Sequence, residues 1–186
     1  EDYTYETFSE TYNDEFEFLY YSGIRDWGVK MDFDYLPNPN HYVKFGLSDT
    51  YHTFYPGQME LRFVQPEFNE SIDTSFVFSD RLYSHDAYVY LEDDIKFNDR
   101  FKANIGLHAS LFRVGDKNYT SLQPRFSARY LIDENWSAKI SYAEMQQNIH
   151  LLTNSNAGLP TDIWVPSTEL VKPQESSQIA AALTRT

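Results

Sequence analysis

The clearest pattern in the chain is an alternation of apolar and polar side chains that continues over long stretches. In the expected strand at residues 101–113, apolar side chains occupy every second position from 101 to 111, and polar or small side chains occupy the positions between them. Successive side chains of a β-strand point to opposite faces of a sheet. The pattern therefore predicts a strand with one apolar and one polar face. The same alternation predicts strands over residues 24–35, 41–50, 83–96, 122–131 and 136–143.

Length and charge separate these strands from those of an ordinary soluble sheet. They exceed the five or six residues that are usual in globular proteins. Their polar faces also carry full charges, as faces that touch water do: Lys102, Arg125, Arg129 and Lys139. About 9–11 tilted residues cross a bilayer in a barrel wall, whereas a membrane helix needs roughly 18 apolar residues in a row. No such run occurs, so we expect an all-β fold, an antiparallel transmembrane β-barrel.

The connections differ in length at the two ends of the predicted sheet. Short turns are expected at residues 37–40, 98–99 and 133–135, and longer segments at 12–22, 51–82, 115–118 and 149–172. Outer-membrane barrels have short periplasmic turns and longer extracellular loops. Aromatic side chains gather near the strand ends, as in the girdles of such barrels. Asp93 interrupts one apolar face, and we expect it at the interfacial rim, where a charge costs little.

Composition narrows the classes of function and leaves two alternatives open. The 186 residues have a formal net charge of −13, which argues against nucleic acid because phosphate binding needs a basic surface. A complete eight-stranded outer-membrane barrel, acting as an enzyme or adhesin, would pair residues 4–9 with residues 178–183. A soluble β-sandwich binding module would bury Ile105, Leu107, Phe126 and Ile140 against a second sheet. Both chain ends have the pattern of interrupted strands, so we expect a piece of a longer protein.

Several segments resemble one family of membrane proteins. Residues 149–155 (IHLLTNS), 158–167 (GLPTDIWVPS) and 172–174 (KPQ) are similar to a segment of Bacteroidetes-type TonB-dependent outer-membrane receptors. Residues 23–27, 39–46 and 90–93 are similar to the same family. The resemblance covers most of the chain, and the loop from His150 to Gln174 is its most specific part.

The resemblance implies a location, a function and a set of partners. Such receptors are 22-stranded barrels with an N-terminal plug domain, and they take up metal chelates, vitamins, glycans or peptides in the outer membrane. The chain would supply about seven or eight middle strands of that wall, without the plug. The implied partners are outer-membrane lipid, the rest of the barrel and plug, TonB through an N-terminal region outside this chain, and a surface lipoprotein. No enzymatic activity and no cofactor are expected.

Candidate chemistry lies on the polar strand faces and in the long segments. The histidines lack metal-ligand spacing, and no nucleophile or phosphate-binding motif is present, so we expect neither a metal site nor a catalytic site. Charges inside a plugged barrel would pair with the plug or line the passage. The lumen-facing candidates are Lys30, Asp32, Asp34, Lys44, Lys102, Asn104, His108, Arg125, Arg129 and Lys139. Aromatic and polar loop residues are typical of ligand sites, and the extracellular-loop candidates are Tyr51, His52, Phe54, Tyr55, Asp162 and Trp164.

Overall fold

The computed structural model describes residues 2–11, 14–65, 70–77, 80–153 and 162–185. Nine strands form one antiparallel sheet in the order β1-β2-β3-β5-β6-β7-β8-β11, with β4 also paired to β3. Their bounds are β1 Asp2–Thr11, β2 Asp14–Asn38, β3 His41–Gln65, β4 Glu70–Val77, β5 Leu82–Lys96, β6 Phe101–Val114, β7 Lys117–Leu131, β8 Trp136–Gln147 and β11 Gln174–Arg185. Two short strands, β9 (Ile149–Leu152) and β10 (Ile163–Pro166), form a separate hairpin.

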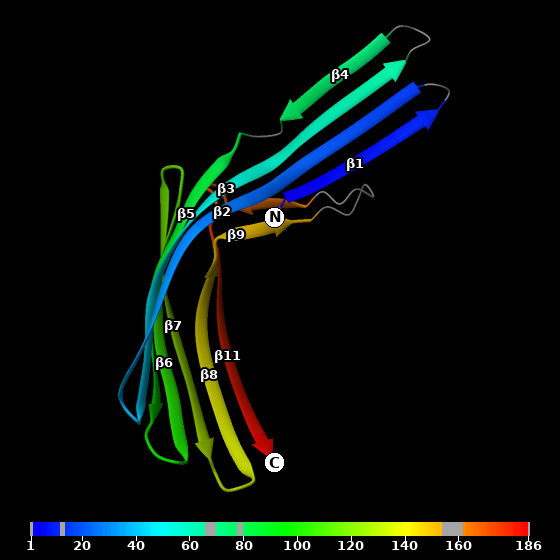
Figure 1. The fold of residues 1–186 in the computed structure, drawn as a ribbon. Helices are drawn as coiled ribbons and strands as arrows, with labels where there is room; N and C mark the ends of the chain where they lie inside the picture. The colour runs from blue at the N-terminus through cyan, green and yellow to red at the C-terminus, as the bar shows by residue number, and fades with distance from the viewer. Residues whose placement is uncertain (1, 12–13, 66–69, 78–79, 154–161, 186) are drawn as a thin grey trace.

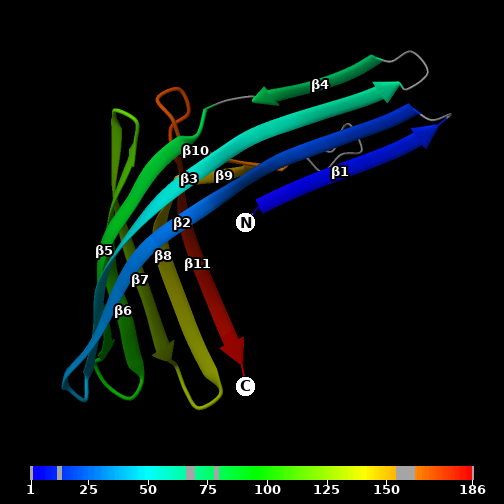
Figure 2. The same ribbon diagram turned by 45° about the horizontal axis from the view of Figure 1, so that its top comes forward.

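The sheet curls into a half-barrel, which confirms the predicted all-β antiparallel fold. Figures 1 and 2 show the strands curving together, with the β9–β10 hairpin on the concave side. The polar faces of the strands line the concave side, and the apolar faces form the convex side. Within the described residues, no helix is long and apolar enough to cross a bilayer.

The convex face is a continuous apolar belt, and no second sheet formed by the described residues covers it. Ile105, Leu107, Phe126 and Ile140 keep 50, 47, 39 and 50% of their surface exposed, so the soluble-sandwich alternative is wrong. On β6 the belt runs from Phe101 to Leu111, about 34 Å of strand at ~3.4 Å per residue. A tilt of about 40° reduces that length to a height of roughly 26 Å, close to the ~25 Å apolar band of outer-membrane barrels.

Two expected loops lie largely in the sheet, and a third expected connection is a short turn. Residues 14–22 already belong to β2, residues 51–65 continue β3, and β4 pairs with the outer part of β3. The connection expected at 115–118 is a turn at Gly115 and Asp116, and β7 begins at Lys117. The parts of these strands that extend beyond the apolar belt have water on both faces. Their sequences therefore need no apolar face, and their mixed polar composition resembles that of a loop.

The extended part of the sheet bends away from the wall at one point. The β2–β3 register shifts between Tyr21 and Gly23, which face Gln58 and Tyr55, so β3 holds one extra residue there. Gly57 has a φ of 132°, a conformation that favours glycine. A bulge of this kind bends a strand and increases its twist. We call this bend the elbow; above it, β1–β4 project from the wall (Figures 1 and 2).

Two further expectations fail in the structure. β1 pairs with β2 and β11 pairs with β8 at opposite ends of the strand order, so the described residues do not make the closing contact of a small eight-stranded barrel. Asp93 does not lie at the rim of the belt. It lies between the outward-facing Leu91 and Ile95, and its carboxylate is 2.6 Å from His41 Nδ1. The imidazole partner explains how a carboxylate is held at that depth.

Candidate functional site

The concave face is organised in rows, because the strand register places one side chain of each strand at the same height. One row contains Lys44, Glu92 and Arg125. The adjacent row joins Asp94 to Asn104, whose amide nitrogen donates to the carboxylate at 2.9 Å. Acidic and basic side chains therefore alternate around the middle of the wall. We call this concave surface of β2, β3 and β5–β8 the inner wall.

Nearest the short turns, the inner wall carries a row of cations. Lys96 lies opposite Lys102, Lys102 opposite Arg129, and Arg129 opposite Lys139. Lys96 forms an ion pair with Asp99 at 2.7 Å, and its hydrogen bond lowers the pKa of that turn carboxyl. Within the described residues, the other three have no carboxylate at ion-pair distance. Like charges placed opposite each other destabilise a sheet, so this row favours an anionic partner.

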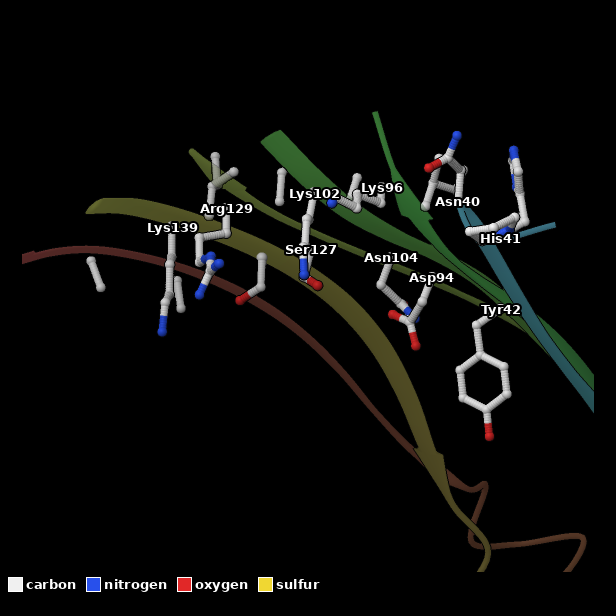
Figure 3. A pocket seen from close by; sticks show the side chains of 18 of the residues that line it. Asn40, His41, Tyr42, Asp94, Lys96, Lys102, Asn104, Ser127, Arg129 and Lys139 are labelled. Atoms are coloured by element: carbon white, nitrogen blue, oxygen red, sulfur yellow. The ribbon is translucent and has the colours of Figure 1, made fainter. Parts of the chain in front are cut away.

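The cationic row borders a hollow of about 780 Å³ on the concave face. Figure 3 shows Lys139, Arg129, Ser127 and Asn104 projecting to the same side of the sheet, together with Asp94 and Tyr42. The side chains come from β3, β5, β6, β7 and β8. The hollow is therefore a property of the curled wall as a whole and not of a single hairpin.

Higher on the inner wall, the acidic side chains of β2 have partners on β2 itself, on β3 and on β5. Lys30 Nζ is 3.1 Å from Asp32. The hydroxyl of Tyr90 donates to Asp32 at 2.7 Å, and that of Tyr42 donates to Asp34 at 2.9 Å. These contacts fix the tyrosine rings against the wall and leave an inner surface lined by phenol, ammonium and carboxylate groups.

Residues 162–169 cross the inner wall near the long-loop end, and we call this segment the strap. Ser22 Oγ of β2 donates to the carbonyl oxygen of Asp162 at 2.6 Å, and Tyr119 of β7 donates to that of Thr168 at 2.6 Å. The roughly six residue steps between these contacts extend about 20 Å, and four strand-to-strand steps across a sheet cover about 19 Å. The strap therefore spans β2 to β7 in nearly extended form, and its β10 part packs on β2 and β3.

Polar contacts hold the strap near its second end. Lys117 Nζ is 2.6 Å from Glu169, and this hydrogen-bonded carboxylate raises the pKa of the lysine. The backbone nitrogen of Ser167 donates to the carbonyl oxygen of Asn148 at 2.7 Å. Asn148 in turn donates from Nδ2 to Asp86 of β5 at 3.2 Å. The end of β8, the strap and β5 are thereby joined in one network.

The side chains near the strap form the best-buried part of the molecule. Phe54 and Phe112 are fully buried, and both belong to the inner wall. Beside Phe54, His52 Nδ1 is 2.7 Å from Asp26, and Ser84 lies opposite His52 in the register. Within the described residues, His52 Nε2 and Ser84 Oγ are buried without a hydrogen-bond partner.

Comparison with known proteins decides the family. The family model described as TonB dependent receptor-like, beta-barrel matches residues 1–183 of the chain. The chain belongs to this family. No curated protein matches the receptor chain. The family is one of outer-membrane transporters, whose barrels contain a plug and interact with TonB, and it is not a family of enzymes.

The receptor barrel places the predicted lumen residues on one surface. All of the lumen-facing candidates named from the sequence alternate onto the concave face, on β2, β3, β5, β6, β7 and β8. The loop candidates are divided. His52 and Phe54 belong to the inner wall, and Asp162 and Trp164 belong to the strap. Tyr51 and Tyr55 lie on the opposite face of β3, so they point away from the lumen.

The contacts that hold the strap of the receptor barrel were not found from sequence. Ser22 and Asp162 are 140 residues apart in the chain, and Tyr119 and Thr168 are 49 apart. Neither pair belongs to a motif. In the described part of the receptor, no group of three or more His, Cys, Asp or Glu side chains is arranged to hold a metal ion.

Proposed function

We propose that the chain is part of the barrel wall of a TonB-dependent outer-membrane transporter that takes up a scarce nutrient. The observation that carries this proposal is the family match over residues 1–183 of a curled antiparallel sheet. The substrate class is a metal chelate, vitamin, glycan or peptide, as in receptors of the Bacteroidetes type. Each of these is polar, and a polar inner wall favours its passage.

The strap and the cationic row have different roles in this proposal. The strap lies near the extracellular end of the lumen and presents Asp162 and Trp164 to a ligand that arrives from outside. The cationic row lies near the periplasmic turns, where the plug domain would fill the barrel. Lys102, Arg129 and Lys139 would there meet carboxylates of the plug. The plug, the rest of the barrel, TonB and a surface lipoprotein are the proposed protein partners.

Uptake by cells that produce the full-length protein tests the proposal. Cells with and without the gene would be given labelled ferric chelates, cobalamin, oligosaccharides and oligopeptides in parallel. We expect one of these classes to accumulate only in cells with the gene, and accumulation to stop when TonB is deleted. A protein absent from the outer-membrane fraction, or uptake that persists without TonB, would contradict the proposal.

A further inference from the structure

Two arginines on the convex face flank one tyrosine ring at the elbow. The guanidinium carbons of Arg25 and Arg81 lie 5.9 and 5.1 Å from the ring centre of Tyr55. Tyr21 meets the same ring edge-on, with centroids 5.9 Å apart. With Gly57 and its neighbours these side chains line a hollow of about 370 Å³. We call Arg25 and Arg81 the arginine pair.

No carboxylate of the described residues balances the charges of the arginine pair. Both side chains are exposed, and among the described residues neither forms an ion pair with a carboxylate. The chain has 28 acidic and 15 basic side chains, so acidic partners are abundant. Two guanidinium groups on one patch of so acidic a chain, without a carboxylate partner among the described residues, favour an anion from outside the chain.

The arginine pair lies directly beyond the apolar belt. Arg25 precedes the outward-facing Trp27 by two residues on β2, and Trp27 lies opposite Tyr51 on β3. Tyr51 stacks on Tyr83, with ring centroids 6.0 Å apart. Two residues of strand advance about 7 Å. The guanidinium groups therefore lie about 7 Å beyond the aromatic girdle, at the height of the lipid headgroups.

We propose that the arginine pair binds the phosphorylated glucosamine headgroup of an outer-leaflet glycolipid of the lipid A type. The assignment rests on the proposed function, since it requires long loops outside the cell. Guanidinium groups bind phosphate through paired, charge-assisted hydrogen bonds. Tyr21 and Tyr55 offer aromatic surface to a sugar ring. The acyl chains of the same lipid would continue along the belt beneath, so the site extends the lipid interface already described.

Lipid binding by the full-length protein in nonionic detergent tests the proposal. The probes are bis-phosphorylated lipid A and the same lipid after enzymatic removal of both phosphates, each titrated and counted by native mass spectrometry. We expect dephosphorylation to weaken binding roughly tenfold, the effect of losing one charge-assisted hydrogen bond. The double variant Arg25→Gln with Arg81→Gln should lose a similar factor. Arg100→Gln, an exposed arginine in the turn at the opposite end, is the matched control and should bind as the unmodified protein does.

Three outcomes would overturn the assignment. The assignment is wrong if the two lipids bind equally or if the double variant binds like the control. It is also wrong if inorganic phosphate displaces the lipid completely, because that result identifies a free-phosphate site. If the double variant does not assemble, the comparison of the two lipids on the unmodified protein still decides. Uptake is measured separately, so a protein that transports without distinguishing the lipids refutes the lipid site alone.

Discussion

Arginine substitutions at consecutive positions of β7 separate the two faces of the wall. Phe126 faces outward opposite Ile105, and Ser127 faces inward opposite Asn104. Ile105 is four residues from Phe101, which places this row roughly 10 Å above the lower edge of a ~26 Å belt. Phe126 therefore lies about 3 Å from the midplane by the same geometry.

The expected cost follows from that depth. An arginine on the lipid face near the midplane costs about 2–4 kcal/mol, so Phe126→Arg should reduce the folded-to-unfolded ratio by a factor of roughly 30 to 1,000. Ser127→Arg places the same side chain in water, where surface substitutions usually change stability by less than ~0.5 kcal/mol. Phe101→Arg, at the edge of the belt, should cost at most about 1 kcal/mol.

The assay is the amount of folded barrel in the outer membrane. Folded and unfolded full-length protein are separated by their mobility in unheated detergent gels, and stability is measured by urea titration in lipid vesicles. We expect Phe126→Arg to be nearly absent from the folded band and Ser127→Arg to match the unmodified protein. Equal yields for the two variants, or a larger loss for Phe101→Arg than for Phe126→Arg, would refute the assignment of the convex face to lipid.

Three smaller predictions concern the inner wall. Phe54→Ala should lower the free energy of unfolding by about 3–5 kcal/mol because a fully buried ring is lost, whereas Phe45→Ala, on the lipid face, should cost much less in the same urea titration; equal losses would contradict the burial of Phe54. Tyr119→Phe removes the hydrogen bond to Thr168 and should weaken the strap by about 1 kcal/mol, seen as faster amide hydrogen exchange near Thr168 without a change at β1. Gly46→Ala should lower folded yield, because a Cβ there would lie 2.5 Å from a backbone oxygen of β2; unchanged yield would mean that the two strands can separate locally.

The sequence predicted the wall well because alternation is a local property. A period of two fixes which residues share a face, so Lys102 and Arg129 could be assigned to the polar side without knowledge of their neighbours. Strand lengths were predicted less well. Residues 14–22 and 51–65 lie in strands that pass beyond the apolar belt, where neither face must be apolar.

The strap could not be predicted for a different reason. Its position depends on single hydrogen bonds, such as that of Ser22, between residues that are far apart in the chain, and serine and tyrosine are common on any polar face. The pairing of Asp93 with His41 is of the same kind: the sequence shows an acid on an apolar face but not the base that stabilises it. Tyr55 faces outward because the alternation of β3 continues through it, and the register shifts only beyond it, at Pro56 and Gly57.

The strap also limits how the wall can deform. A curled sheet can open when its strands move apart and its curvature decreases. The strap is hydrogen-bonded to β2 at one end and to β7 at the other, so it restrains the distance between these two strands. The hydrogen bond from Asn148 to Asp86 adds a third attachment at β5, which lies between them in the sheet. The mouth of the barrel over this arc therefore keeps a constant width while those bonds hold. In the proposed transporter, the size limit for an entering solute would then be set by movement of the strap itself and not by separation of the strands.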